Sequence, residues 1–386
     1  MSTGTSIVEL PLGHPGLKDF VKFPWKLYRG DPGWTPPLNA DYLGSRLLGL
    51  KGLLTRNHPY HRHAEVTHFL AKRDGQTIGR ISAAVNHEFN RYHKTNLGSF
   101  GFFEVVNDYD TARLLIDHAR DWASRHGVDT MRGPGEYSNA THERQGILVE
   151  GFEYQPTVEC THNPPYYGQF LERYGMRKAK DYLALNGNIA TDNLGLLRRL
   201  ARHVDRRNVE IRCIDIKNLR AEVQLIVEMY NEAWAANWGF MPMTREEGDA
   251  IADTLRLIID PGLVRFAYVG GKPAAVMGLI PDPNQALRPR WKWYGDSDFV
   301  RVTRLLIMRR RIRQTRGMFF GIRPQFRMSG LPALIMNEIA DYMITRGYTD
   351  AEGSLILEDN DGIIRLVTTF GTRFTKRWRI YDLPLK

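Results

Sequence analysis

The chain has 386 residues, of which 42% are hydrophobic and 25% charged, a composition typical of a soluble globular protein with two domains. It has no run of about eighteen apolar residues, and its N-terminus has no basic segment before an apolar one, so we expect neither a transmembrane helix nor a signal peptide. The formal charge of +10 favours anionic partners, and two isolated cysteines argue against disulfides and fit a reducing cytoplasm.

The first predicted elements belong to an N-terminal half. A proline-punctuated segment, 23–38, leads into it. Two alternating runs around an Asp-Gly turn at 69–83 predict a β-hairpin. An amphipathic helix ending at Gly127 is expected within 114–133. The segment 133–146 lacks the Gly-x-Ser-x-Gly motif of hydrolases, and we expect it to line a cleft of this half.

Several histidines of this half lie close together in the sequence. Their spacing matches no zinc motif and no cysteine joins them, so we expect no metal site. These residues are His58, His61, His63 and His68.

The second half repeats the order of the first. The run 265–279 predicts another hairpin, and its Gly271 lies 196 residues after Gly75. The same spacing separates Gly175 and Gly371, which close the predicted Asn-led helices in 163–176 and 360–372. Each copy then reads as hairpin, strand, helix, strand, helix, strand, which is a mixed α/β order and neither a doubly wound sheet nor a barrel. We place the domains at 1–190 and 205–386.

The segment 323–336 of the second copy predicts a strand that turns into a helix. Gly330 allows a close approach of the backbone, and Pro332 suits the first helical turn, so free N–H groups and the helix dipole would favour an anion there. The pattern resembles the coenzyme A pyrophosphate loop of the GNAT superfamily of acyl-CoA N-acyltransferases, although Pro332 replaces the usual Gly or Ala. The alternative is a plain turn before a helix.

This resemblance covers nearly the whole chain as two tandem GNAT-like domains, each a mixed, mostly antiparallel sheet flanked by helices. It implies acyl-CoA or acetyl-CoA as the co-substrate of the C-terminal domain. The N-terminal domain has Asp108 and Asp110 at the matching helix start, which would cap the helix and repel a pyrophosphate, so we expect no coenzyme A there. The residues expected to bind coenzyme A are Arg323, Gln325, Phe326, Arg327, Met328, Ser329, Gly330, Leu331, Ala333 and Asn360.

Catalytic residues are harder to assign. GNAT enzymes use a Glu or an ordered water as the base and a Tyr of the final helix as the acid, but Val367 stands at that Tyr position. The resemblance leaves Glu352 on the predicted fifth strand as the candidate base and Tyr381 as the candidate acid. Structural roles are the alternative for both, and Asn360 could simply cap a helix.

Two further segments bear on the acceptor. Aromatic and polar residues of 230–244 are candidates for acceptor binding, with core packing as the alternative. In the insert 288–316, seven arginines from Arg301 to Arg316 surround apolar residues that lie near helical spacing, namely Val302, Leu305, Leu306 and Ile312. This pattern is typical of a membrane-surface or acidic-substrate helix, the alternative being a core-packed helix with a solvated arginine face. The acceptor candidates are Tyr230, Asn231, Trp234 and Trp238; the aromatic residues before the insert helix are Trp291, Trp293 and Tyr294.

We therefore predict a CoA-dependent N-acyltransferase that acylates a small-molecule or lipid primary amine. The alternatives are long-chain acyl transfer to a lipid amine at the membrane surface and a non-catalytic acyl-CoA-binding module. We expect a cytoplasmic protein with a peripheral contact to the inner membrane face through 288–316. Nucleic acid is the least favoured partner, because net charge alone suggests it and no reading motif occurs.

Overall fold

The computed structural model describes residues 4–137, 144–290, 297–327 and 330–385. They form two compact units. Unit 1 comprises 1–182, 288–301 and 376–386, and unit 2 comprises 183–287 and 302–375. The chain therefore leaves and re-enters each unit, and the domain bounds 1–190 and 205–386 stay a prediction.

Unit 1 contains a mixed sheet in which β1 to β4 pair antiparallel and β4 pairs parallel with β5. The end of β13 pairs antiparallel with β5 and β6. Its elements are β1 (Ser6–Leu10), α1 (Leu17–Leu27), α2 (Asn39–Leu43), β2 (Ala64–Arg73), β3 (Gln76–Asn86), α3 (His87–His93), β4 (Leu97–Val105), α4 (Tyr109–Arg125), β5 (Thr130–Gly135), β6 (Ile147–Glu150) and α5 (Tyr166–Arg173).

Unit 2 repeats this arrangement, with β8 to β11 antiparallel and β11 parallel to β12. Its elements are α6 (Leu194–Arg202), β8 (Val209–Cys213), α7 (Leu219–Ala233), α8 (Arg245–Leu255), β9 (Val264–Val269), β10 (Lys272–Pro281), α9 (Asn284–Leu287), β11 (Gln314–Ile322), α11 (Leu331–Arg346), β12 (Asp350–Leu357) and α12 (Asp361–Thr369). Three elements carry residues of both units: β7 (Arg177–Asn188), α10 (Asp298–Met308) and β13 (Arg373–Pro384).

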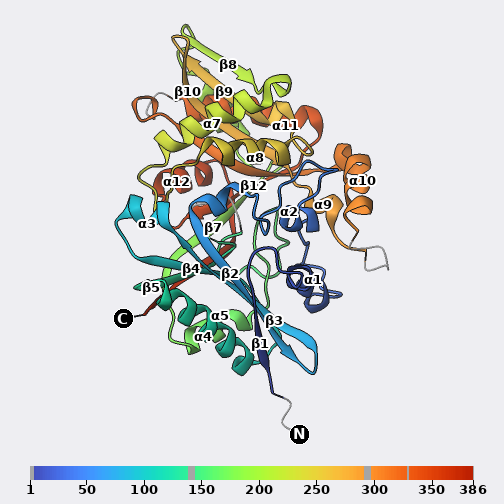
Figure 1. Cartoon of the computed structure of the whole chain (residues 1–386). Helices are drawn as coiled ribbons and strands as arrows, with labels where there is room; N and C mark the ends of the chain where they lie inside the picture. Colours follow the sequence, from blue (N-terminus) through green and yellow to red (C-terminus); the bar gives the residue numbers. More distant parts are fainter. Residues whose placement is uncertain (1–3, 138–143, 291–296, 328–329, 386) are drawn as a thin grey trace. The chain divides into compact units, whose positions relative to one another are not determined.

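Both predicted hairpins are confirmed. Asp74 and Gly75 have φ values of 50° and 74°, and Gly270 and Gly271 have 56° and 75°, so each turn has two left-handed residues, as in the type I′ turns that match the twist of paired strands. Strand alternation then distributes the side chains of β2 over two cores. Phe69 joins the core under α4 and α5, and its neighbour Leu70 joins the core under α1, on the opposite face of the sheet (Figure 1).

The parallel strand pair of each unit separates part-way along its length. Paired residues end at Gly101 and Gly135 in unit 1, whereas β4 continues to Val105. In unit 2 they end at Gly317 and Gly353, whereas both strands continue. Each unit thus has a point where two neighbouring parallel strands diverge.

One helix start differs from the prediction. Helix α5 begins after Pro165, and the expected leading residue Asn163 instead accepts from the N–H of Leu148 (2.6 Å) and donates to its carbonyl (3.2 Å). The buried amide of Asn163 satisfies both backbone groups of a β6 residue, which outweighs a cap on an accessible helix start. In unit 2 the matching Asn360 does cap α12, accepting from Ile363 N.

Candidate functional site

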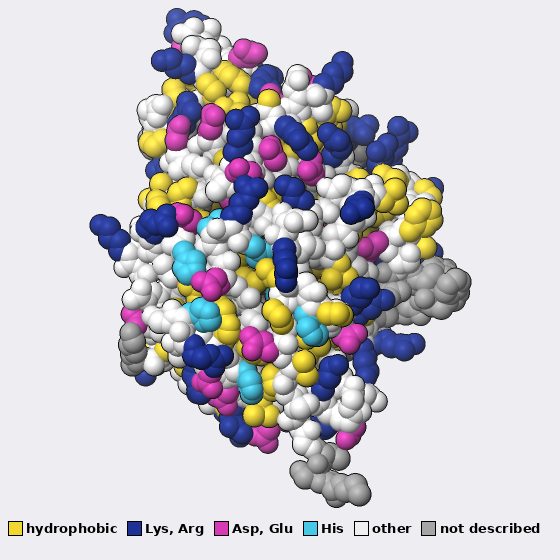
Figure 2. All heavy atoms as spheres, viewed as in Figure 1, with side chains coloured by type: hydrophobic (Ala, Val, Ile, Leu, Met, Phe, Trp, Pro, Cys, Tyr) yellow, Lys and Arg dark blue, Asp and Glu magenta, His cyan; other side chains and the backbone are white. Residues whose placement is uncertain are grey.

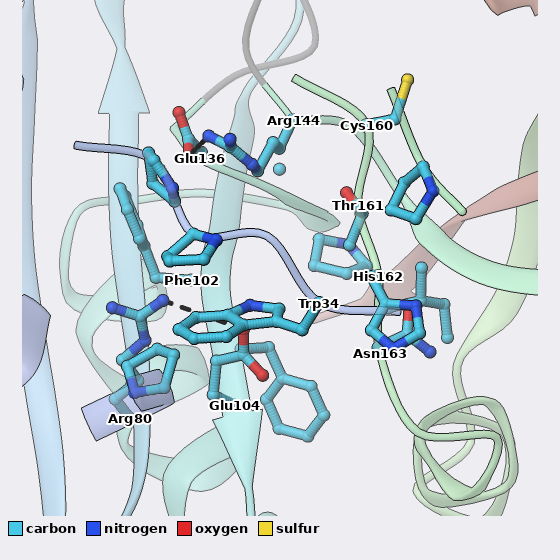
Figure 3. Close-up of a pocket in the computed structure, with 18 of the residues that line it drawn as sticks. Trp34, Arg80, Phe102, Glu104, Glu136, Arg144, Cys160, Thr161, His162 and Asn163 are labelled. Carbon is cyan, nitrogen blue, oxygen red and sulfur yellow. Dashed lines mark hydrogen bonds and ion pairs between the residues drawn. The ribbon is translucent and has the colours of Figure 1, made fainter. Parts of the chain in front are cut away.

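A pocket opens in unit 1 where β4 and β5 diverge, and it contains about 830 Å³ of atom-free space, part of it open to solvent (Figure 3). Residues from the ends of both strands line it, with others from α1, from the segment between α1 and α2, and from the segment before α5. The predicted loop 133–146 contributes Gly135, Glu136 and Arg144, which confirms that it lines a cleft of this half.

An aromatic wall closes one side of the pocket. The ring of Trp34 stacks on Tyr28, with centroids 5.1 Å apart, and meets Trp25 edge-on at 5.4 Å. In Figure 3 the Trp34 indole lies across the pocket, with Arg80 on one side and His162 and Asn163 on the other. Such a wall offers an apolar surface with fixed geometry to a ligand.

The segment carrying this wall is held by residues far along the chain that belong to the same unit. Asp298 accepts from the backbone N–H groups of Asn39 (2.9 Å) and Ala40 (2.7 Å). Arg301, which is 1% exposed, donates to the carbonyls of Pro36 and Pro37. Proline has no backbone N–H, so Pro36 and Pro37 can form backbone hydrogen bonds only through their carbonyls. Arg301 supplies the donors for these carbonyls.

A buried ion pair forms the floor of the pocket. Arg80 and Glu104 face each other on β3 and β4, and their charged groups lie 3.8 Å apart. Tyr28 and Tyr167 donate to the same carboxylate oxygen of Glu104 at 2.5 and 2.9 Å. Burial raises the pKa of Glu104, and the Arg80 charge together with the tyrosine hydrogen bonds lowers it in part. Burial, followed by the Glu104 charge, also raises the pKa of both tyrosines, so they remain donors.

A second carboxylate is also fully engaged. Glu136, which is 7% exposed, accepts from Arg144 at 3.2 Å and from the hydroxyl of Tyr42. Burial and then the charge of Glu136 raise the pKa of Tyr42. Neither pocket carboxylate is therefore an open ligand for a metal ion or a free general base.

His162 also lines the pocket. Its Nε2 lies 2.9 Å from Asp31 Oδ2, and the other oxygen of Asp31 accepts from Gly33 N at 2.7 Å. This carboxylate is fixed by the backbone and therefore orients the imidazole, in the manner of a base and its orienting group.

Sequence reasoning missed this site. It treated 23–38 only as a lead-in, although Asp31 and Trp34 lie there. A usable signal existed in Arg80 and Glu104, since opposite charges on facing positions of otherwise apolar strands indicate a buried polar site. No local pattern connects either residue with His162.

The predicted coenzyme A loop forms a strand, a turn and a helix in unit 2, as expected. Strand β11 leads through the short 3-10 turn η5 (Pro324–Phe326) to α11, and Gly330 precedes the helix with φ 76°. Within the described residues, no side chain caps this helix start, and its first turn has no acidic residue. Met328 and Ser329 lie outside the described residues.

The other predicted loop residues have identified surroundings. Arg323 pairs with Glu232 at 2.9 Å, and the exposed Arg327 donates to the Ala233 carbonyl at 3.2 Å. Gln325 is exposed and Phe326 half-buried, while Leu331 and Ala333 point into the core. Arg327 and the uncapped helix start are thus the parts of the loop that an anion could reach.

The matching helix of unit 1 is closed by its own side chain. Asp108 caps α4 by accepting from Asp110 N and Thr111 N, and Arg73 donates to it at 2.5 Å. Its pKa is lowered, because hydrogen bonds from Arg73 and Thr111 outweigh the effect of burial, so the carboxylate stays ionised. This arrangement would repel a pyrophosphate.

The candidate catalytic residues belong to different units. Glu352, on β12 in unit 2, is 2% exposed and lies opposite Arg316 near the end of the paired region. Tyr381, on β13 in unit 1, is 1% exposed and donates to Glu172 at 3.0 Å. Burial, reinforced by Glu172, raises the pKa of Tyr381.

The candidate acceptor residues gather at the end of α7. Tyr230 packs against Trp234, with ring centroids 4.8 Å apart, and the Trp234 indole donates to the Phe320 carbonyl at 3.3 Å. The Asn231 amide accepts from Met243 N and donates to Met243 O, so its polar groups serve the backbone. Trp238 is half-buried in the segment after α7.

Of the histidines flagged in the sequence, His68 is buried in unit 1, whereas His58, His61 and His63 are half-buried. His68 is fully buried between the Leu10 carbonyl (3.0 Å) and the Tyr137 hydroxyl (2.8 Å), and burial lowers its pKa to about 4. The described residues contain no group of three or more His, Cys, Asp or Glu side chains placed to hold a metal ion. Among the described helices, none has the length and apolar character needed to cross a bilayer.

The sequence of the chain was compared with family models and with individual proteins. No model of a known protein family matches the chain. It is 30% identical over 393 residues to a protein named bacterial ceramide synthase from Caulobacter vibrioides (strain NA1000 / CB15N), covering 100% of this chain and 99% of that protein. The chain belongs to the family of this ceramide synthase. Protein YghO of Escherichia coli (strain K12) is 27% identical over 385 residues, covering 97% of this chain and 95% of its own.

Solved structures confirm the fold. A tandem GNAT protein from the clavulanic acid biosynthesis pathway matches with a TM-score of 0.58 over 99% of each chain, at 12% identity. The glucosamine N-acetyltransferase region of a fungal GH3 β-N-acetylglucosaminidase matches with 0.57 over 99% of this chain and 38% of that one, also at 12%. The predicted tandem GNAT architecture is therefore confirmed, and the fold and the family relation together support acyl transfer in general.

Proposed function

We propose that the protein is an acyl-CoA-dependent N-acyltransferase whose acceptor is a long-chain amine of the sphingoid type, and whose product is a ceramide-type amide. The observation that carries this proposal is the full-length similarity to a protein named ceramide synthase. The pocket of unit 1, with an aromatic wall and a buried polar floor, suits an acceptor with an apolar chain and a polar head.

The reaction is a simple acyl exchange. The acceptor nitrogen attacks the thioester carbonyl, the C–S bond breaks, the nitrogen loses one proton, and the coenzyme A thiolate takes one up. The protein must therefore accept a proton from the amine, stabilise the oxygen of the tetrahedral intermediate and return a proton to sulfur. Glu352 and Tyr381 remain our sequence-derived candidates for the base and the acid.

Unit 2 is the proposed donor site. The start of α11 presents uncapped N–H groups behind Gly330, without acidic residues in its first turn, and Arg327 lies just before it. Beyond Gly317, β11 continues away from its partner strand and offers backbone groups for an extended pantetheine arm. The carboxylate cap of α4 supports the same assignment, because it disfavours a pyrophosphate in unit 1.

Helix α10 is the proposed membrane contact. Phe299 and Ile307, two turns apart on this helix, are 73% and 74% exposed, and Leu306 beside Ile307 is 46% exposed. Figure 2 shows hydrophobic side chains gathered over α10. The exposed arginines at 309–311 follow directly, so apolar side chains could enter the lipid interface while guanidinium groups meet anionic headgroups. A long-chain acceptor would be taken from that surface.

A direct assay tests the proposal. Purified protein is incubated with palmitoyl-CoA and a C18 sphingoid base, and the amide is measured by mass spectrometry while free thiol is followed by absorbance. We expect amide and thiol in equal amounts, and far less product from spermidine. Absence of amide across acetyl-, decanoyl- and palmitoyl-CoA would end the enzymatic assignment.

The donor site has its own test. Arg327→Glu places a negative charge beside the proposed diphosphate and should weaken binding of coenzyme A at least about tenfold. Lys272→Glu makes the same charge change on an exposed strand end of unit 2 and should leave binding unchanged. Equal affinities for the two variants, measured by calorimetry, would count against the α11 site.

A further inference from the structure

One nitrogen of the His162 ring, Nδ1, is buried and has no hydrogen-bond partner within the described part of the chain. The His162 side chain lines the unit 1 pocket and is only 10% exposed. A buried polar atom without a partner is unfavourable, so its presence at a pocket wall indicates a group that a ligand supplies.

The rest of the ring is held by the segment between α1 and α2. His162 Nε2 lies 2.9 Å from Asp31 Oδ2, and the N–H of Gly33 donates to the other carboxylate oxygen at 2.7 Å. Gly33 lies so close to the ring that a Cβ built there would be 2.6 Å from Cε1 of His162. A flip of the ring would put a carbon in place of Nε2 and lose the bond to Asp31. Since Asp31 does not line the pocket, this bond holds Nε2 outside the pocket and leaves Nδ1 as the ring nitrogen for a ligand.

The Asp31 carboxylate also decides which ring nitrogen carries the proton. An ionised carboxylate only accepts hydrogen bonds, so the proton lies on Nε2 and the lone pair of the neutral imidazole lies on Nδ1. Nδ1 is therefore an acceptor, and the group that satisfies it must be an N–H or an O–H.

The charges of the pocket favour a cationic donor. Arg80 pairs with Glu104 at 3.8 Å, and Arg144 pairs with Glu136 at 3.2 Å, so each arginine already has a carboxylate. Among the described residues, no Lys or Arg pairs with Asp31, whose partners are the His162 ring and the N–H of Gly33. A cation at Nδ1 would offset the Asp31 charge, which a neutral hydroxyl group would not do.

The aromatic wall supports the same choice. Figure 3 shows His162 on the side of the Trp34 indole opposite to Arg80, so the guanidinium does not share this end of the pocket. The faces of aromatic rings attract cations, and the rings of Trp34 and Tyr28 lie in the same wall.

We infer that His162 selects a primary ammonium head group in this pocket, with one N–H of the ligand donating to Nδ1. The inference rests on the proposed function and deepens it, because it names the residue that recognises the amine of the acceptor. It concerns binding within unit 1 and requires no transfer of a proton. A quaternary ammonium group has the same charge without an N–H, and a sulfate ester has neither, so both would leave Nδ1 without a partner.

Calorimetry with three ligands of one chain length tests this recognition. Octylammonium, octyltrimethylammonium and octyl sulfate share the chain and differ in the head group. Wild-type protein should bind octylammonium at least about tenfold more tightly than the other two, because it alone satisfies Nδ1. Equal or tighter binding of octyltrimethylammonium would show that charge and aromatic contact suffice, and tighter binding of octyl sulfate would show that Nδ1 carries a proton. Either result overturns the inference.

A pair of variants assigns the preference to one side chain. His162→Phe keeps a ring but has no nitrogen, and should bind octylammonium and octyltrimethylammonium within about twofold of each other. His118→Phe makes the same exchange at an exposed histidine of α4 and should keep the wild-type ratio. A full preference in His162→Phe would overturn the inference. If His162→Phe fails to fold, as judged by circular dichroism, the wild-type ratio decides alone, and a ratio near one overturns the inference.

These outcomes are separate from the test of the proposed function. If the protein makes no amide but prefers octylammonium through His162, the acyltransferase assignment fails and the recognition of the amine stands. If it makes amide while His162→Phe keeps the preference, the inference fails and the proposed function stands.

Discussion

Arg301 and Asp298 hold the segment that carries the pocket wall, and their removal should change the free energy of unfolding by a predictable amount. Arg301 is almost fully buried, and its guanidinium donates to the backbone carbonyls of Pro36 and Pro37. We consider Arg301→Met, which keeps most of the aliphatic volume and removes the charge. The buried Pro36 carbonyl and the part-buried Pro37 carbonyl then lose this donor, and Asp298 loses the positive charge that lies 3.9 Å away.

The expected loss follows from these contacts. A hydrogen bond to a charged group contributes about 1.5–3 kcal/mol, and removing one partner of a buried pair costs about 3–5 kcal/mol. Met recovers part of the packing, so we expect the free energy of unfolding to fall by about 3–5 kcal/mol in total. With an m-value of about 2–3 kcal/mol/M, the urea midpoint should fall by roughly 1–2.5 M.

Urea unfolding followed by tryptophan fluorescence measures this shift, since Trp25 and Trp34 lie next to the altered site. Arg309→Met, an exposed arginine of the same insert, is the matched control and should stay within about 0.5 kcal/mol of wild type. An Arg301→Met midpoint as close to wild type as that of the control would refute the reasoning. It would show that the buried guanidinium contributes nothing net to holding the wall.

Three other predictions follow from single residues. Gly330→Ala should lower the free energy of unfolding by about 2 kcal/mol, because φ is 76° and the new Cβ would lie 2.9 Å from a side-chain carbon of Val204. Gly75→Ala, with φ 74° and open space around the new Cβ, should lower it by only about 1 kcal/mol. Equal losses in urea titrations would rule out the Val204 contact. Ile307→Asp should reduce the amount of protein that floats with vesicles containing anionic lipid at least about tenfold. Leu47, which is 86% exposed and lies outside α10, provides the control. An equal reduction by Leu47→Asp would contradict a specific membrane contact of α10. The pKa of His68 is about 4 in the folded protein and about 6.5 in the unfolded chain, so the unfolded chain binds a proton first as the pH falls. This residue should therefore lower the free energy of unfolding by about 3 kcal/mol between pH 6.5 and pH 4. In urea titrations across that range, the free energy of unfolding of His68→Gln should depend less steeply on pH.

In the insert 288–316, the apolar spacing correctly predicted most of the buried residues but not the position of every side chain. Val302, Leu305 and Ile312 are buried as their spacing predicts, but Leu306 is exposed. Arg301, expected on a basic face, is instead buried in unit 1. Trp291, Trp293 and Tyr294 lie outside the described residues. Helical periodicity identifies an apolar face, but it cannot tell which charged residue finds backbone acceptors elsewhere in the chain.

The sequence by itself determined the features that depend on a few neighbouring residues. Positive φ values require Asp-Gly or Gly-Gly at the two hairpin turns, carboxylates cap helices near them in the chain, and a repeat spacing of 196 residues reveals two copies of one fold. The strand, turn and helix around Gly330 were predictable for the same reason.

Only the tertiary structure decided where the polar pocket lies. Asp31, Arg80, Glu104 and His162 become neighbours through the pairing of β3 with β4 and the packing of two irregular segments, and no local pattern encodes that arrangement. Whether each polar atom is satisfied or left without a partner depends on the same long-range packing. Desolvation and hydrogen bonding therefore set the chemistry of this site, and both are properties of the folded chain as a whole.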